Sequence, residues 1–207
     1  MKTVAVVLLI FCFGLSTVEN TKCYECRQSN AQSCEGKEVD CPKGSSCMTI
    51  STKTGLNHTY YAIQKRCSMN MKCNHSMYAY ASGDVYFDLS IDCCEGDLCN
   101  SGGVIIKNTT YDYNGPECPV CSSVDSLDIC EAVSTTVCRN KTDYCNYFTG
   151  HLERPDGVKT QFTARGCMSE TSCSYDFSQI VGLKVSDVKA GCKGYKHNPK
   201  PNPEPEN

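Results

Sequence analysis

The chain has 207 residues, of which 19 are cysteine and none is tryptophan; 21% are charged, and the formal net charge is −3. This density of cysteine is typical of small domains stapled by disulfides and excludes a large cytosolic enzyme fold. The 20 basic and 23 acidic residues nearly balance and form no basic stripe, so nucleic acid is excluded as a partner.

Residues 1–20 are predicted to be a secretory signal peptide. Lys2 precedes an apolar run from Val4 to Leu15, and the small residues Ser16 and Thr17 follow it. The run is too short to span a bilayer. Cleavage between residues 16 and 20 would remove one cysteine and leave an even number, so we expect nine disulfides in a secreted, extracellular protein.

The spacing of the remaining cysteines repeats along the chain. Ten cysteines and then eight follow nearly the same succession of short and long intervals, and each set begins with Cys-x2-Cys. Self-similarity of this kind indicates tandem domains. We expect a first domain over residues 21–101, a linker over 102–115, a second domain over 116–193 and a disordered, proline-rich tail over 194–207. The tail lacks the apolar run of a glycolipid-anchor signal, so no membrane anchor is expected.

The long gaps between cysteines are predicted to be β-hairpins. In the second unit, alternate residues of 158–165 are apolar and polar, the period of a half-buried strand. Glycine-bearing turns separate the paired segments. The expected hairpins are 48–53 with 59–65 around the turn 54–57, 76–81 with 85–91 around 82–84, and 146–153 with 158–165 around 154–157. Since no stretch of ten or more residues has helical periodicity, both units are expected to be mostly β.

These features resemble the Ly-6/urokinase-receptor three-finger domain. The resemblance is carried by the Cys-x2-Cys start, the finger-sized gaps and the ending Cys93-Cys94-Glu-Gly-Asp-Leu-Cys99-Asn100. It implies a small disulfide-rich all-β fold of two tandem three-finger domains, the second without the last disulfide. The spacing alone leaves the connectivity open. The resemblance implies the pairs Cys23–Cys47, Cys26–Cys34, Cys41–Cys67, Cys73–Cys93, Cys94–Cys99, Cys118–Cys145, Cys121–Cys130, Cys138–Cys167 and Cys173–Cys192.

Over residues 21 to about 193 the chain is also similar to two-domain gamma-type phospholipase A2 inhibitors and sodefrin precursor-like factors. The similarity lies in Cys145-Asn-Tyr-Phe-Thr-Gly, Arg154-Pro155, Arg165-Gly-Cys167-Met-Ser and Gly182-Leu-Lys. It implies a secreted, non-enzymatic module that binds a secreted phospholipase A2. The alternative that it implies is a pheromone-like signalling protein recognised by a receptor. The sequence leaves open whether the protein forms a homo-oligomer.

Catalytic, metal and cofactor sites are not expected. The two Cys-x2-Cys pairs have a spacing found in zinc sites, but pairable cysteines in an oxidising compartment favour disulfides. A cysteine nucleophile needs a free thiolate beside a histidine, and no free thiol is expected. The chain is therefore predicted not to be an enzyme.

Two groups of residues are predicted to act at the surface. The sequons at Asn57, Asn74, Asn108 and Asn140 are expected to carry glycans. Apolar and tyrosine side chains are candidate anchors for a protein partner, because tyrosine combines a large contact area with a polar group. These candidates are Ile105, Ile106, Tyr111, Tyr113, Tyr60 and Tyr61. The alternative role of the tyrosines is to seal the contact between the two domains.

Overall fold

The computed structural model describes residues 20–68, 72–106 and 111–193. Residues 1–19 of the predicted signal peptide, the tail over 194–207 and the sequon at Asn108 lie outside the described residues. Among the residues that are described, no helix is long and apolar enough to cross a membrane.

The first domain is a row of three antiparallel hairpins. They are β1 (Lys22–Ser29) with β2 (Lys37–Asp40), β3 (Cys47–Leu56) with β4 (His58–Cys67), and β5 (His75–Ser82) with β6 (Val85–Cys94). Their order across the sheet is β2-β1-β4-β3-β6-β5. Both long hairpins lie where the glycine-bearing turns of the sequence predicted them.

The second domain has five strands and two short 3-10 turns. The strands are β7 (Glu117–Val124), β8 (Ser134–Val137), β9 (Tyr144–Glu153), β10 (Lys159–Met168) and β11 (Lys184–Cys192), and the turns are η1 (Glu170–Ser174) and η2 (Phe177–Gln179). The strand order is β8-β7-β10-β9-β11. The prediction of two mostly β units is confirmed.

The turn between β3 and β4 is tighter than the sequence indicated. Strand β3 continues through Gly55 to Leu56, which pairs with His58. The reversal takes place at Asn57 alone, with φ of 66°. Asparagine enters this left-handed region more readily than most residues. Gly55 lies close to the turn but not in it. Gly55 stays in β3 because it pairs with β4 on one side and with β6 on the other.

Nine disulfides join the described cysteines, and they are the pairs that the family resemblance implied. Most of them gather at one end of each domain, where Cys23, Cys41 and Cys47 form one buried cluster and Cys118, Cys138 and Cys167 another. Domains of this size bury too little apolar surface for a robust core. Each bridge typically adds about 2–4 kcal/mol, chiefly by restricting the unfolded chain.

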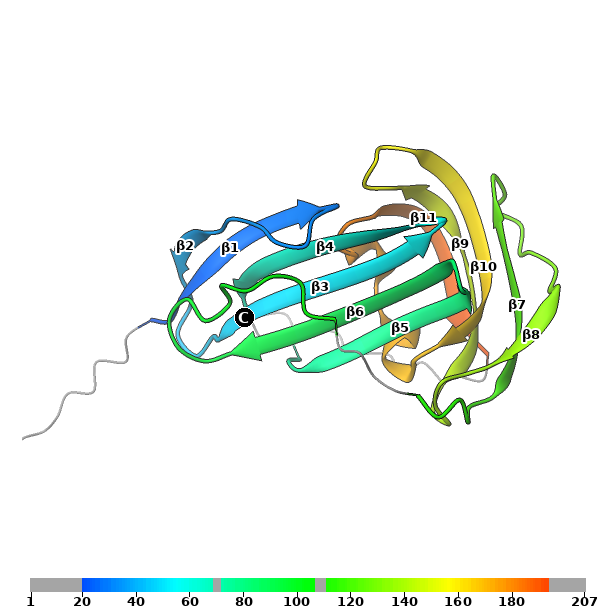
Figure 1. The fold of residues 1–207 in the computed structure, drawn as a ribbon, viewed down its shortest axis with the longest axis horizontal. Coiled ribbons are helices and arrows are strands. Elements are labelled where there is room, and N and C mark those ends of the chain that lie inside the picture. The colour runs from blue at the N-terminus through cyan, green and yellow to red at the C-terminus, as the bar shows by residue number, and fades with distance from the viewer. Residues whose placement is uncertain (1–19, 69–71, 107–110, 194–207) are drawn as a thin grey trace, which may run out of the picture.

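Strand β10 joins the two domains. It pairs with β9 along its whole length and with β7 over residues 162–165, and its last two residues pair with Tyr80 and Ala79 of β5. Figure 1 shows β9 and β10 crossing beyond the ends of β3 and β6. The eleven strands of the described chain therefore form one continuous sheet.

The main hydrophobic core also belongs to both domains. Met48, Phe87 and Leu89 of the first domain pack in one cluster with Phe177 and Val181 of the second. Phe177 lies edge-on to Phe87, with ring centroids 6.3 Å apart. Two hydrogen bonds close the border of the cluster: Thr52 Oγ1 donates to the carbonyl oxygen of Val181 (2.8 Å), and Arg27 Nη2 donates to that of Ile180 (3.1 Å).

The end of the first domain and the start of the linker cover the opposite face of the first sheet. The backbone N–H of Ile105 donates to Ser51 Oγ (2.9 Å), and Lys65 Nζ donates to the carbonyl oxygen of Ser101 (2.9 Å). Ser51 and Lys65 are consequently buried. Burial lowers the pKa of Lys65, because the charged amine loses water. Strand β3 is thus covered on both faces.

Candidate binding surfaces

Arg139 forms the centre of a polar contact between the domains. Its guanidinium lies 4.4 Å from the ring centroid of Tyr78 and 4.5 Å from that of Tyr111, and Nη1 is 3.2 Å from Asp88 Oδ1. Asp88 raises the pKa of Arg139 against the opposing effect of burial. Tyr78 also donates its hydroxyl hydrogen to Asp143, and burial together with this bond raises the pKa of Tyr78. The cluster holds the first domain, the linker and the second domain together.

A second polar contact between the domains lies near the turn of the β3–β4 hairpin. Tyr60 Oη donates to Asp156 Oδ2 (3.0 Å), and Asp156 sits in the predicted turn 154–157, where the N–H of Gly157 donates to the carbonyl oxygen of Arg154. Arg154 donates to both carboxylate oxygens of Asp156, at 3.1 and 2.7 Å. Chiefly because of these bonds, the pKa of Asp156 falls to about 2.

The candidate anchors predicted from the sequence are divided between these contacts and the surface. Tyr60 is 7% exposed, and Tyr111 packs against Tyr78 with ring centroids 5.8 Å apart. Both seal the domain contact, which is the alternative role considered for the tyrosines. Ile105 and Tyr113 are 44% and 56% exposed. Ile106 and Tyr61 are half-buried.

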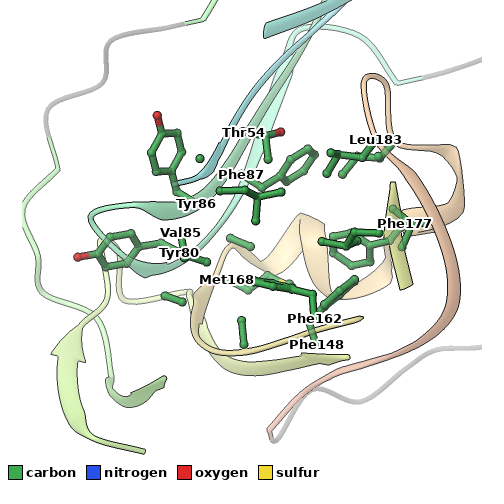
Figure 2. A pocket seen from close by; sticks show the side chains of 18 of the residues that line it. Thr54, Tyr80, Val85, Tyr86, Phe87, Phe148, Phe162, Met168, Phe177 and Leu183 are labelled. Atoms are coloured by element: carbon green, nitrogen blue, oxygen red, sulfur yellow. The ribbon is translucent and has the colours of Figure 1, made fainter. Parts of the chain in front are cut away.

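An apolar cavity lies between the two domains. Its volume is about 80 Å³, and Figure 2 shows Phe87 facing Phe148, Phe162 and Met168 across it, with the hydroxyl of Tyr86 pointing away. Asn146 also borders the cavity, and its buried Oδ1 has no hydrogen-bond partner among the residues that the structure describes.

A more polar cleft adjoins the cavity. The two hollows share Leu56, Val85, Leu152 and Phe162 as wall residues. The cleft has a volume of about 360 Å³ and is further lined by Asn57, Ser122, Ser123, Val124, Arg154 and Thr160. A hollow that passes from apolar to polar along its length can hold an amphiphilic molecule.

The first hairpin of the second domain carries the largest group of exposed aliphatic side chains. We call residues 117–138 the acidic finger; it comprises β7, β8 and the loop between them. The exposed aliphatic residues are Val124 (54%), Leu127 (36%), Ile129 (54%), Val133 (86%) and Val137 (42%). Four exposed carboxylates, Glu117, Asp125, Asp128 and Glu131, lie among them, and the segment contains no lysine, arginine or histidine. Its formal charge is therefore negative throughout.

The anchors predicted from the sequence were tyrosines and the apolar residues of the linker, so they did not include this finger. A signal was present: the segment between Cys121 and Cys138 contains five aliphatic residues without the alternation of a half-buried strand. Residues in a short hairpin with no second layer over them have nothing to pack against, so they remain exposed.

Two clusters of cysteine have the proximity of metal ligands, Cys23 with Cys41 and Cys67, and Cys118 with Cys138 and Cys167. All six sulfur atoms are in disulfides. A disulfide sulfur has no thiolate charge with which to bind a metal, so these clusters are structural. Of the four sequons, Asn57, Asn74 and Asn140 are exposed.

Comparisons with known proteins agree with the two-domain arrangement. The model of the u-PAR/Ly-6 domain matches residues 19–102 and 114–196. The chain is 28% identical to Protein RoBo-1 of Rattus norvegicus over 130 residues, which are 62% of this chain and 51% of that protein. It is 29% identical to lymphocyte antigen 6 complex locus protein G6d of Mus musculus over 143 residues, 63% of this chain and 90% of that one. The chain thus spans about half the length of RoBo-1.

A solved structure, that of mouse TEX101, aligns with 83% of this chain and 97% of its own, at 16% identity and a TM-score of 0.37.

Proposed function

Because the chain belongs to the u-PAR/Ly-6 domain family, whose domains are typically small binding modules, we propose that it is a secreted, non-enzymatic protein that binds a protein partner through the acidic finger. The observation that carries this proposal is the set of five exposed aliphatic side chains among four carboxylates. An exposed apolar patch of this kind marks an interaction surface in a soluble protein.

The chemistry of the finger favours a partner that is both apolar and cationic. Proteins that bind anionic lipid surfaces have such a face, because apolar side chains enter the interface while lysine and arginine contact the headgroups. The acidic finger offers the same combination of aliphatic groups and negative charge as that lipid surface. We therefore propose that it covers the lipid-contact face of a secreted phospholipase A2.

The shape of the finger supports this role. The disulfide Cys121–Cys130 ties the loop to β7, and Cys118 and Cys138 fix the base of the hairpin in the buried sulfur cluster. Thr135 donates its hydroxyl hydrogen to Glu117 across the two strands. A loop held in this way loses little conformational entropy when it binds, and rigid surfaces bind more tightly for that reason.

The experiment is a titration of the oxidised protein against a panel of secreted phospholipases A2, with binding and residual hydrolysis measured together. We expect nanomolar binding that abolishes hydrolysis and that weakens as salt rises, because salt screens the attraction of the finger for cations. The variant Ile129→Ser with Val133→Ser should lose at least about tenfold in affinity, because truncating an anchor at the centre of an interface costs about 2 kcal/mol or more.

The matched control is Ile105→Ser with Tyr113→Ser, which removes two exposed anchors from the linker. Unchanged binding in this control assigns the contact to the finger. If the control loses affinity and the finger variant does not, the linker is the contact surface and the proposal is wrong. An absence of binding across the whole panel would leave the receptor-recognised signalling protein as the better explanation of the fold.

A further inference from the structure

We propose that the cavity between the domains and the cleft beside it together bind a single-chain amphiphile with an uncharged, hydroxyl-bearing head, such as a monoacylglycerol. The site adjoins the proposed phospholipase contact, because three wall residues of the cleft, Ser122, Ser123 and Val124, belong to the acidic finger.

The cavity fits the end of an aliphatic chain. Its walls are mostly apolar side chains from both domains, with Phe87, Leu152 and Leu183 among them. At about 80 Å³ it has roughly half the volume of an apolar cavity that holds benzene, which corresponds to about three or four carbon atoms. The remainder of a longer chain would pass between Leu56 and Val85, which border both hollows.

The polar groups of the cleft fit a head that forms hydrogen bonds. Ser122, Ser123 and Thr160 are among its wall residues. Ser123 Oγ donates to the carbonyl oxygen of Val124 and Thr160 Oγ1 to that of Gln161, so the oxygens of these two hydroxyls are left to accept. Hydroxyl groups both donate and accept hydrogen bonds, so they suit a glycerol head.

The charge of the cleft excludes an ionic head. Arg154 is the cation among the wall residues, and its guanidinium is bonded twice to Asp156. The pair is neutral overall, so neither a carboxylate nor an ammonium head gains a free counter-charge there. A charged head would lose water without compensation.

The test titrates the full oxidised chain with 1-monolaurin below its critical micelle concentration and follows displacement of an environment-sensitive fluorescent dye. Laurate and dodecyltrimethylammonium, with tails of the same kind, serve as the charged comparisons. We expect saturable binding of one molecule per chain, with a Kd on the order of micromolar. Binding of either charged amphiphile should be at least about tenfold weaker.

Two variants locate the site. Ala164→Phe places a ring in the cavity and should weaken binding of monolaurin at least about tenfold. Its matched control is Ala132→Phe, an identical change at an exposed position of the acidic finger, which should bind as the wild type does. Ser122→Ala with Ser123→Ala leaves the core untouched and should weaken binding about fivefold, through loss of hydrogen bonds to the head.

The proposal is overturned by an absence of saturable binding, by equal affinity for laurate and monolaurin, or by unchanged binding in both the cavity and the serine variants. Non-reducing peptide mapping confirms the nine disulfides in each variant before titration. Phospholipase binding in the same preparations separates the two proposals, because Ala164→Phe changes a wall residue of the cavity that lies outside the acidic finger and should retain it.

Discussion

Arg139 stabilises the domain contact in two ways that depend on its planar guanidinium. It lies over the rings of Tyr78 and Tyr111 while it pairs with Asp88. Its side chain is only 15% exposed, so water does not screen the pair as it would at the surface. Cation–π contacts contribute up to about 2 kcal/mol when they are shielded from water.

The change Arg139→Lys keeps the positive charge and removes the planar group. We expect it to lower the free energy of unfolding by about 1–2 kcal/mol, because an ammonium cannot stack on two rings and pair with a carboxylate at once. Urea unfolding with the disulfides intact measures this. Arg165→Lys, in β10, is the control and should change stability by less than about 0.5 kcal/mol. Equal effects would assign the stabilisation to charge alone.

Asp156 makes its contact with Tyr60 of the β3–β4 hairpin dependent on pH. Its pKa in the folded protein, about 2, lies below the ordinary value of 3.8. A carboxyl group with a lowered pKa stabilises the fold above its unfolded pKa, and that stabilisation disappears as the pH falls through the folded pKa.

We therefore expect Asp156→Asn to lower the thermal midpoint relative to the wild type at pH 6, and the difference to vanish between about pH 4 and pH 2. Thermal unfolding across this range measures it. Asp112→Asn, an exposed position in the linker, is the control. A difference that persists undiminished at pH 2 would contradict the role of the ionised carboxylate.

At the scale of the element, the hairpin of β3 and β4 depends on the conformation of one residue. Asn57 has φ of 66°, which costs an ordinary L-residue about 1–2 kcal/mol and glycine almost nothing. Asn57→Ala should therefore be about 1 kcal/mol less stable than Asn57→Gly. Both changes remove the same sequon, so the comparison is independent of any glycan. Chemical unfolding of the two variants, side by side, measures the difference, and equal stability would show that the turn relaxes.

Much of the architecture could be predicted because the signals are local. The glycine-bearing turns and the alternation over 158–165 identified the hairpins, and the cysteine spacing identified the two domains. What the sequence did not reveal depends on contacts between distant segments. Gly55 stays in β3 because two neighbouring strands pair with it. Tyr60 is buried at the contact with the other domain, where Asp156 accepts its hydrogen bond.

At the scale of the whole molecule, the junction between the domains depends on a close approach of two backbones, that of β10 and that of β5. Gly166 lies beside β5, and a Cβ atom there would come within 2.0 Å of the carbonyl oxygen of Tyr80 and 2.8 Å of Ala81 Cα. Only a residue without a side chain allows this approach. Gly166 is thus the residue that permits the sheet to continue from one domain into the next.

Gly166→Ala should separate β10 from β5 and lower the free energy of unfolding by about 1–3 kcal/mol, because backbone rather than a flexible side chain must move. The same change at Gly83, where nothing lies within 4 Å of the added atom, is the control. Urea unfolding measures stability, and binding of an apolar dye detects opening of the shared core. Equal behaviour of the two variants would show that the junction adapts without cost.

The shared core has a consequence for how the protein is made. Met48, Phe87 and Leu89 are covered by Phe177 and Val181, which leave the ribosome roughly 100 residues later, and synthesis proceeds at about 5–20 residues per second. For several seconds, a newly synthesised first domain whose disulfides have formed exposes these hydrophobic side chains to water. We expect chaperones to bind the exposed hydrophobic side chains during this interval. A chain truncated after the linker never covers them, so we expect it to be retained by chaperones or to aggregate.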